Sequence, residues 1–153
     1  MATSRRLTSS RSCSRSFHNY YLCVGSIRRS QHIKCTPEKA WEIIGDPSRL
    51  HEWFPIVSCR VEGAKRWIHL ANGLVFEEDI VLVDNSMRRF QYTIVNNPIV
   101  TQHLGTVDVI DDGRGECIAI YSTDMKPNVL ALGIGAAANH GLAKVKKILE
   151  GTL

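Results

Sequence analysis

Several signals of membrane proteins, metalloproteins and hydrolases are missing from this chain of 153 residues. No stretch approaches the roughly 18 consecutive apolar residues that a membrane-spanning helix needs. The six histidines show neither HxxxH nor HExxH spacing, and no GxSxG motif marks a nucleophile. We therefore expect no membrane span, no bound metal and no Ser- or Cys-based catalysis.

Acidic residues are absent from the first 24 positions, which carry four arginines. The whole chain has 19 Lys and Arg and 15 Asp and Glu, so the rest of the chain is balanced at 15 of each sign. A neutral body without a basic stripe lacks the electrostatic signature of a nucleic-acid-binding protein. Nucleic acid is therefore not an expected partner.

The leader, residues 1–24, is rich in Ser and Arg, and its longest apolar run, residues 20–24, is too short for a secretory signal. Three interpretations remain open: a disordered tail, an organellar transit-like peptide, or non-native sequence ahead of a start near Val24. Five cysteines without a CxxC pair favour free thiols in a reducing compartment. We expect a cytoplasmic protein, or an organellar one if the leader is a transit peptide, with one domain over residues 25–153.

Helix signals occur near the start of this domain and at its end. A capping threonine, a proline and an acidic residue at positions 36–38 predict the start of a short helix. A second short helix is predicted over residues 48–54. A long helix is predicted over residues 129–149, capped by Asn128 and ended by Gly151.

Alternating runs separated by Asn-, Asp- and Gly-rich turns predict an antiparallel sheet. Its seven strands are expected at residues 26–33, 57–62, 65–71, 74–83, 88–95, 100–110 and 116–125. With two short helices after the first strand and one long helix at the end, this pattern indicates an α+β fold. We expect the curved sheet to wrap around the last helix.

Period-two alternation places Phe76, Glu78, Ile80 and Leu82 on one face of their strand, so Glu78 is a carboxylate on an otherwise apolar face. The same period selects the inward residues of the following strands: Phe90, Tyr92, Ile94, His103, Gly105, Val107, Val109, Ala119, Tyr121 and Met125. The last helix is expected across from them. A space between sheet and helix that holds a few polar groups is by default a ligand pocket.

The first half of the last helix contains Gly133, Gly135 and Gly141, although each glycine costs roughly 1 kcal/mol relative to alanine. Three- and four-residue steps predict its buried stripe: Leu130, Ile134, Ala137, Ala138, Gly141, Val145 and Ile148. The spacing of Gly133, Gly135 and Ala138 imitates a dinucleotide fingerprint. It lies inside a helix with too little chain after it, so no cofactor is expected.

The chain from about Ser26 to Glu150 resembles the polyketide cyclase/dehydrase and lipid-transport superfamily (SRPBCC, START-like). The resemblance rests on PEKAW at 37–41, IGDPSRLHEWFP at 44–55, CRVEG at 59–63, Gly73 followed by Glu78, Asp84, RRFxY at 88–92, and Gly141-Leu142. It implies a helix-grip fold, in which a seven-stranded antiparallel sheet wraps around a long C-terminal helix. It also implies a cavity for an apolar or amphipathic small molecule.

The face assignment and the resemblance together give the expected ligand-binding residues: Trp53, Val57, Arg66, Ile68, Glu78, Tyr92, His103, Tyr121, Gly133, Ala137 and Gly141. Three of them, Glu78, His103 and Tyr121, are also the candidates for acid–base catalysis. By the same resemblance, the loop over residues 96–100 lines or gates the cavity.

Several functions follow from these residues. The first is binding or carriage of a hydrophobic small molecule that is lipid- or polyketide-like. The second is a cyclase or dehydratase reaction on an enolisable ketone in the same cavity. A third is an interaction module whose loop at 96–100 closes over ligand and presents a surface to a partner.

Two further expectations concern structure rather than chemistry. Glu78 and Arg66 form a plausible pair across the sheet, and a purely structural buried ion pair is the alternative to a ligand-binding role. Trp67 and His69 alternate to the face opposite Ile68, where two roles are expected in place of ligand contact: plain outer surface, or a self-association patch that would form a homodimer.

Overall fold

The order of elements along the chain follows its hydrophobic patterning. The computed structural model describes residues 24–152. Its elements are β1 (Gly25–Ile33), α1 (Pro37–Ile44), the 3₁₀ turn η2 (Pro47–Arg49), α2 (Leu50–Trp53), β2 (Ser58–Glu62), β3 (Lys65–His69), β4 (Val75–Asp84), β5 (Arg89–Val95), β6 (Gln102–Asp111), β7 (Cys117–Lys126) and α3 (Val129–Glu150). The α+β prediction is confirmed. The leader predicted for residues 1–24 lies outside the described residues, apart from Val24.

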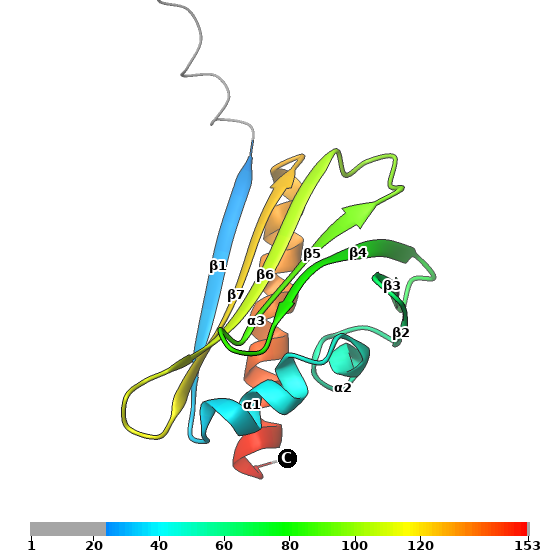
Figure 1. Ribbon diagram of the computed structural model, residues 1–153. Helices are drawn as coiled ribbons and strands as arrows, with labels where there is room; N and C mark the ends of the chain where they lie inside the picture. Colours follow the sequence, from blue (N-terminus) through cyan, green and yellow to red (C-terminus); the bar gives the residue numbers. More distant parts are fainter. Residues whose placement is uncertain (1–23, 153) are drawn as a thin grey trace, which may run out of the picture.

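The seven strands form one sheet in the order β1-β7-β6-β5-β4-β3-β2. The first strand pairs with the last, and the other strands pair with their sequence neighbours as antiparallel hairpins. Figure 1 shows the sheet curving around α3, with α1 and α2 beside the second half of that helix. The helix-grip arrangement implied by the resemblance is confirmed.

Local sequence signals fix two of the helix ends, and a third prediction is wrong. Thr36 Oγ1 accepts a hydrogen bond from the Lys39 backbone N–H at 3.3 Å, which caps α1. Gly151, with φ of 68°, ends α3 in the left-handed conformation. Asn128 makes no side-chain capping bond, because its φ and ψ of −60° and −30° are already helical and a capping residue needs an extended backbone.

A bulge in β4 changes the face of the last residues in that strand. Ile80 pairs with Tyr92, but Leu82 pairs with Gln91, so the register slips by one residue between them. Phe76, Glu78 and Ile80, which precede the bulge, lie on the inner face as predicted. The prediction that Leu82 shares this face is wrong, because the slip turns it outward and leaves it 37% exposed.

Helix α3 packs most closely against β1, which shifts its buried stripe from the predicted one. The buried positions are Ala131, Gly135, Ala138, Gly141, Leu142, Val145 and Leu149. A Cβ atom on Gly135 would lie 2.8 Å from Ile27 Cγ2, so this glycine permits the close approach to β1. The predicted stripe is fully buried at Ala138, Gly141 and Val145, and its other members are half-buried: Leu130, Ile134, Ala137 and Ile148.

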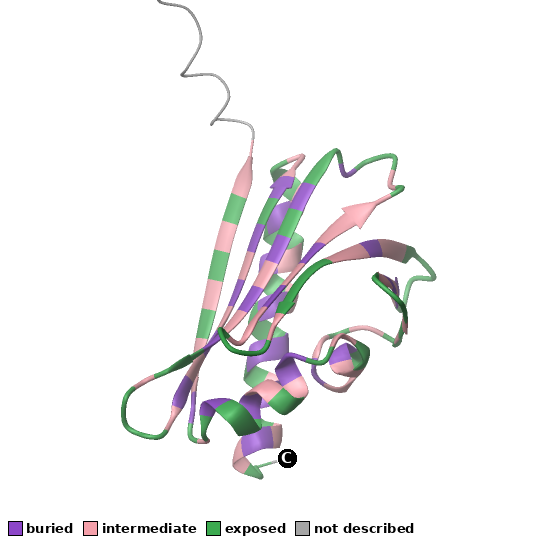
Figure 2. Cartoon of the chain, in the orientation of Figure 1, coloured by how far each residue is buried: buried purple, intermediate pink, exposed green. Residues whose placement is uncertain are grey.

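The apolar core consists of two clusters at opposite ends of the sheet. The larger one packs the sheet against α1, α2 and the second half of α3, and it includes Trp53 and Leu142. The smaller one gathers Val100, Met125 and Ala131 near the start of α3. Figure 2 shows buried residues alternating with less buried ones along β6 and β7. The space between the clusters is where the candidate site lies.

Candidate functional site

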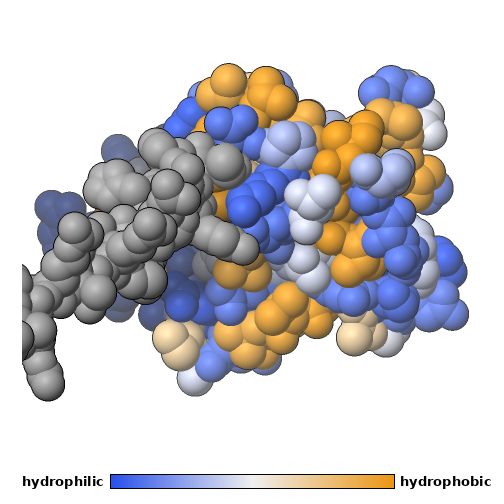
Figure 3. Space-filling view, turned by 90° about the horizontal axis from the view of Figure 1, so that it is seen from above, coloured by the Kyte–Doolittle hydropathy of each residue, from blue (hydrophilic) through white to orange (hydrophobic). Residues whose placement is uncertain are grey.

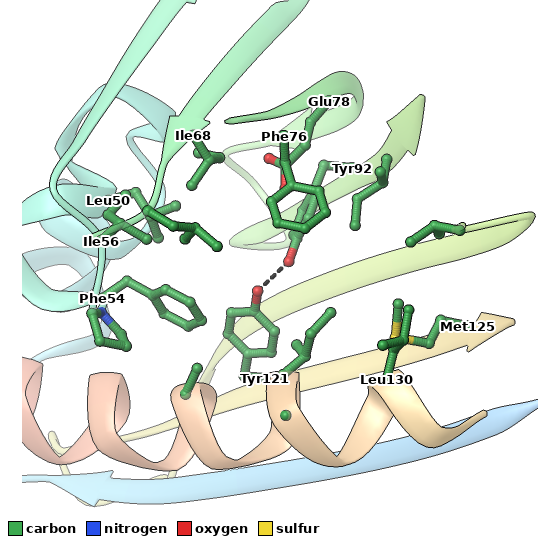
Figure 4. A pocket seen from close by; sticks show the side chains of 17 residues that line it. Leu50, Phe54, Ile56, Ile68, Phe76, Glu78, Tyr92, Tyr121, Met125 and Leu130 are labelled. Carbon is green, nitrogen blue, oxygen red and sulfur yellow. Dashed lines mark hydrogen bonds between the residues drawn. The ribbon is translucent and has the colours of Figure 1, made fainter. Parts of the chain in front are cut away.

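A cavity of about 360 Å³ lies between the sheet and the first half of α3 (Figure 4). Its volume falls within the roughly 300–1,000 Å³ that is typical of small-molecule sites. The lining residues come from α2 and the loop after it, from β3 and the turn after it, from β4, β5 and β7, from the loop before β6, and from α3: Leu50, Phe54, Pro55, Ile56, Ile68, Leu70, Phe76, Glu78, Tyr92, Ile94, Val100, Tyr121, Met125, Leu130, Gly133, Ile134 and Ala137. Only Glu78, Tyr92 and Tyr121 in this set carry polar side chains.

Glu78 is held by an ion pair with Arg66, which occupies the opposite position on β3. Arg66 Nη2 and Nε lie 2.7 and 2.8 Å from the same carboxylate oxygen, Oε2. The arginine is 2% exposed and the glutamate 6%. Burial raises the pKa of Glu78, and the positive charge of Arg66 opposes that rise. The cation therefore lies behind the wall of the cavity, while the carboxylate faces it.

The guanidinium of Arg66 is also enclosed by two aromatic rings. Its Cζ atom lies 4.9 Å from the Phe90 ring centre and 4.7 Å from the Tyr92 ring centre, within the range of cation–π attraction. These contacts leave Arg66 outside the cavity lining and orient it toward Glu78.

The hydroxyl groups of Tyr92 and Tyr121 form a hydrogen bond with each other, drawn as the dashed line in Figure 4. Tyr92 stands on β5 and Tyr121 on β7, so the Tyr92 side chain must cross β6 to reach its partner. It crosses above Gly105, which pairs with Tyr92 in the sheet and whose missing Cβ atom would otherwise collide with the ring. Burial raises the pKa of both tyrosines, that of Tyr121 to about 12, so both hydroxyls are protonated near neutral pH.

His103 lies behind Tyr92 rather than on the cavity wall. Its ring centre is 5.2 Å from that of Tyr92. Nδ1 accepts a hydrogen bond from the Ile94 backbone N–H at 3.1 Å, which places the proton of the neutral ring on Nε2, 3.2 Å from Thr123 Oγ1. Both ring nitrogens are thus engaged within the sheet, and no ring nitrogen remains to meet a ligand.

The structure brings six of the expected ligand-binding residues to the cavity: Ile68, Glu78, Tyr92, Tyr121, Gly133 and Ala137. The others lie elsewhere. Val57 is 63% exposed. Trp53 is buried beside Gly141, whose missing Cβ atom would lie 2.9 Å from Phe54 Cδ2 and 3.2 Å from Trp53 Cε3. Trp53 and Gly141 thus pack α2 against α3, and Phe54 forms the adjoining part of the cavity wall.

The expected ligand-binding residues leave out several residues of the apolar wall. The segment Phe54-Pro55-Ile56 enters the cavity because it leaves α2 beneath the sheet, and nothing in its local pattern distinguishes it from Val57. Phe76, already placed on the face of Glu78, and Leu70, which continues the face of Ile68, line the cavity although neither is among the expected ligand-binding residues.

The loop over residues 96–100 contributes to one end of the cavity. Asn97 Oδ1 accepts hydrogen bonds from the backbone N–H groups of Ile99 and Val100, both at 2.9 Å, which fixes the shape of the loop. Val100 turns into the cavity, whereas Ile99 is 63% exposed. Figure 3 looks onto this end of the molecule and shows several separate hydrophobic areas between hydrophilic ones.

A cluster that could offer metal ligands lies away from the cavity, where β1 meets the β6–β7 turn. His32, Asp112 and Glu116 place one ligand atom each within 4.8 Å of the others. In the structure, His32 Nε2 lies 3.3 Å from Asp112 and 3.0 Å from Glu116, and Arg114 also contacts Asp112. These contacts form a polar network that ties β1 to the turn.

Comparison with known families gives a match over nearly all of the described residues. The sequence profile of a family described as polyketide cyclase/dehydrase and lipid transport matches residues 25–151. A comparison with curated proteins found no match. Among residues 24–152, no helix combines the length and the apolar character that a membrane span needs.

Solved structures share the fold at low sequence identity. The protein XoxI from Bacillus cereus is 23% identical with a TM-score of 0.76, and the match covers 82% of this chain and 96% of that one. A START superfamily protein from Mycobacterium smegmatis is 10% identical with a TM-score of 0.71, covering 84% and 99%. Norcoclaurine synthase from Thalictrum flavum, in complex with dopamine and hydroxybenzaldehyde, is 18% identical with a TM-score of 0.64, covering 96% and 98%.

Proposed function

The chain belongs to the polyketide cyclase/dehydrase and lipid-transport family, and from that premise we propose that it binds and carries a hydrophobic small molecule, lipid- or polyketide-like, in the cavity beneath α3. The observation that carries this proposal is an apolar cavity of about 360 Å³ whose polar side chains are limited to one glutamate and two tyrosines. Sites for small molecules are mostly apolar, with a few polar groups that fix orientation.

Gly133 supports the proposal because it leaves part of the cavity open. A Cβ atom built on Gly133 has no neighbour within 4 Å, unlike those built on Gly135 and Gly141. Gly133 is therefore not needed for close packing of helix and sheet. This glycine costs roughly 1 kcal/mol of helix stability relative to alanine. Since close packing does not require it, we take the space that it leaves as room for a ligand.

Filling this space is expected to block binding. The neutral fluorophore N-phenyl-1-naphthylamine should bind the unmodified chain saturably with one site. Gly133→Leu should weaken that binding at least about tenfold, since Gly133 lines the cavity and a leucine side chain there has open space to occupy. The substitution should not unfold the protein, because leucine is the better helix former.

The matched control is Ala136→Leu, which adds a side chain to the exposed face of the same helix and should leave the affinity unchanged. Fluorescence titration of the three proteins measures both effects. Equal affinity of Gly133→Leu and the unmodified chain would contradict the proposal, as would equal losses in the two variants.

Acid–base catalysis in the same cavity is the second candidate function. It is favoured by one observation: Glu78 and the Tyr121 hydroxyl both face an otherwise apolar volume, where proton transfer to an enolisable ketone is feasible. Because both ring nitrogens of His103 are engaged within the sheet, such chemistry would rest on Glu78 and Tyr121. Conversion of the bound ligand into a different compound during incubation with the protein would favour the catalytic function.

A further inference from the structure

We propose that the ligand of this cavity is an uncharged amphipathic molecule that places one hydroxyl or carbonyl oxygen against Tyr92, Tyr121 and Glu78. This inference rests on the proposed binding function and names the chemical class of its ligand. It is derived from the charges and the hydrogen-bonding capacity of the cavity wall.

The wall offers no cationic side chain to an anionic ligand. None of the 17 lining residues is Lys, Arg or His. Arg66, the cation next to the wall, is committed to Glu78 through two contacts below 3 Å and is shielded by the rings of Phe90 and Tyr92. A ligand carboxylate would instead meet the carboxylate of Glu78 in an apolar surrounding, which disfavours both charges.

The wall does offer hydrogen bonds to a neutral oxygen. In the Tyr92–Tyr121 pair, one hydroxyl donates its proton to the other, and the accepting hydroxyl keeps a proton of its own. Within residues 24–152 neither hydroxyl has another hydrogen-bond partner, so the pair retains one donor and several lone pairs. A ketone can accept from this donor, and an alcohol or phenol can also donate to a tyrosine oxygen or to Glu78.

Glu78 adds an acceptor to the same group. Both contacts from Arg66 go to Oε2, and no hydrogen bond from a described residue reaches Oε1. Figure 4 shows Glu78 and Tyr92 on one side of the cavity and Tyr121 on the other, with the apolar side chains arranged around them. The polar oxygen of a ligand is therefore expected beside Glu78, Tyr92 and Tyr121, and the rest of the ligand against the apolar side chains.

Three biphenyls of nearly equal shape test this assignment: 4-methylbiphenyl, 4-hydroxybiphenyl and biphenyl-4-carboxylate. Each is titrated at pH 7 against protein loaded with N-phenyl-1-naphthylamine, and displacement of the fluorophore gives its affinity. The hydroxyl compound should bind about tenfold more tightly than the methyl compound, as expected for one or two net hydrogen bonds. The carboxylate should bind at least about tenfold more weakly than the hydroxyl compound.

The double variant Tyr92→Phe/Tyr121→Phe identifies the groups responsible. Because it removes both partners of a buried hydrogen bond and keeps both rings, it should fold normally. It should lose most of the preference for the hydroxyl compound, measured as the ratio of the affinities for the hydroxyl and methyl compounds. Retention of that preference in the double variant would overturn the proposal.

The outcomes separate this inference from the proposed function. If all three biphenyls bind and the hydroxyl compound has no advantage, or the carboxylate binds best, the ligand class is wrong and the cavity still functions. If neither the fluorophore nor any biphenyl binds, the proposed binding function itself is wrong and the ligand class falls with it.

Discussion

Replacing Arg66 with methionine is expected to lower the free energy of unfolding by about 3–5 kcal/mol, as measured by urea denaturation at pH 7.5. The substitution removes the only contacts below 3 Å that the described residues make to the Glu78 carboxylate. It leaves that carboxylate buried without a compensating charge. The cost arises from the unpaired anion rather than from lost volume, since methionine fills a similar space.

A neighbouring residue supplies the control for this effect. Lys65 precedes Arg66 on β3 and pairs with Glu77 and Asp79 at 2.7 and 2.9 Å, but it is 44% exposed. Lys65→Met should therefore cost far less, because exposed ion pairs contribute little to stability. The double variant Arg66→Met/Glu78→Leu should recover most of the loss, since it removes both buried charges.

The loss caused by Arg66→Met should depend on pH in a defined direction. Without the arginine, the pKa of Glu78 in the folded state rises further above its value in the unfolded chain. A raised folded-state pKa means that the stability contribution is present at low pH and is lost as the pH rises through that pKa. The variant should thus be closest to the unmodified chain near pH 4. A deficit that is equal at pH 4 and pH 7.5 would contradict this account of Glu78.

His103 is expected to destabilise the protein as the pH falls below neutral. Burial lowers its pKa from 6.5 to about 4, with Asp124 opposing this change and Arg66 adding to it. A lowered folded-state pKa gives stability that is present above pH 6.5 and is lost as the pH falls toward 4. The lowered pKa of His103 corresponds to a stability contribution of roughly 3 kcal/mol, of which about 2 kcal/mol is lost by pH 5.

The geometry gives the same direction, because a protonated ring could not accept the hydrogen bond from the Ile94 backbone N–H. His103→Asn, which retains an acceptor for that N–H, should flatten the dependence of the unfolding free energy between pH 7.5 and pH 5. His140→Gln, at an exposed position on α3, is the control and should leave the dependence unchanged. If His103→Asn and the unmodified chain lose equal stability over this range, the histidine is not responsible.

Much of the fold could be predicted from the sequence because its signals are local. The Thr36-Pro37 start of α1 and the Gly151 end of α3 require only the preferences of those residues. The inner faces of β5, β6 and β7 follow from period two. The error at Leu82 has a different origin, since a bulge depends on how two strands pair and β4 itself carries no local mark of it.

The candidate site could be predicted only in part. The period-two faces correctly brought together Glu78, Tyr92 and Tyr121, and they also suggested the pair between Glu78 and Arg66. They could not reveal that His103 points at the backbone of β5 rather than at the cavity. They also could not show that Gly105 makes room for Tyr92, because that role depends on the side chain of a neighbouring strand.

The central claim, that the cavity holds one neutral small molecule, is tested most directly by native mass spectrometry of the purified full chain, followed by denaturation. We expect a single non-covalent adduct of small mass that is released on denaturation, identified as a neutral compound with a hydroxyl or carbonyl group, and absent from Gly133→Leu. A chain that carries no adduct and gains no stability when offered neutral apolar compounds would contradict the account. Close packing would still account for Gly135 and Gly141, and Gly133 would be left without a role.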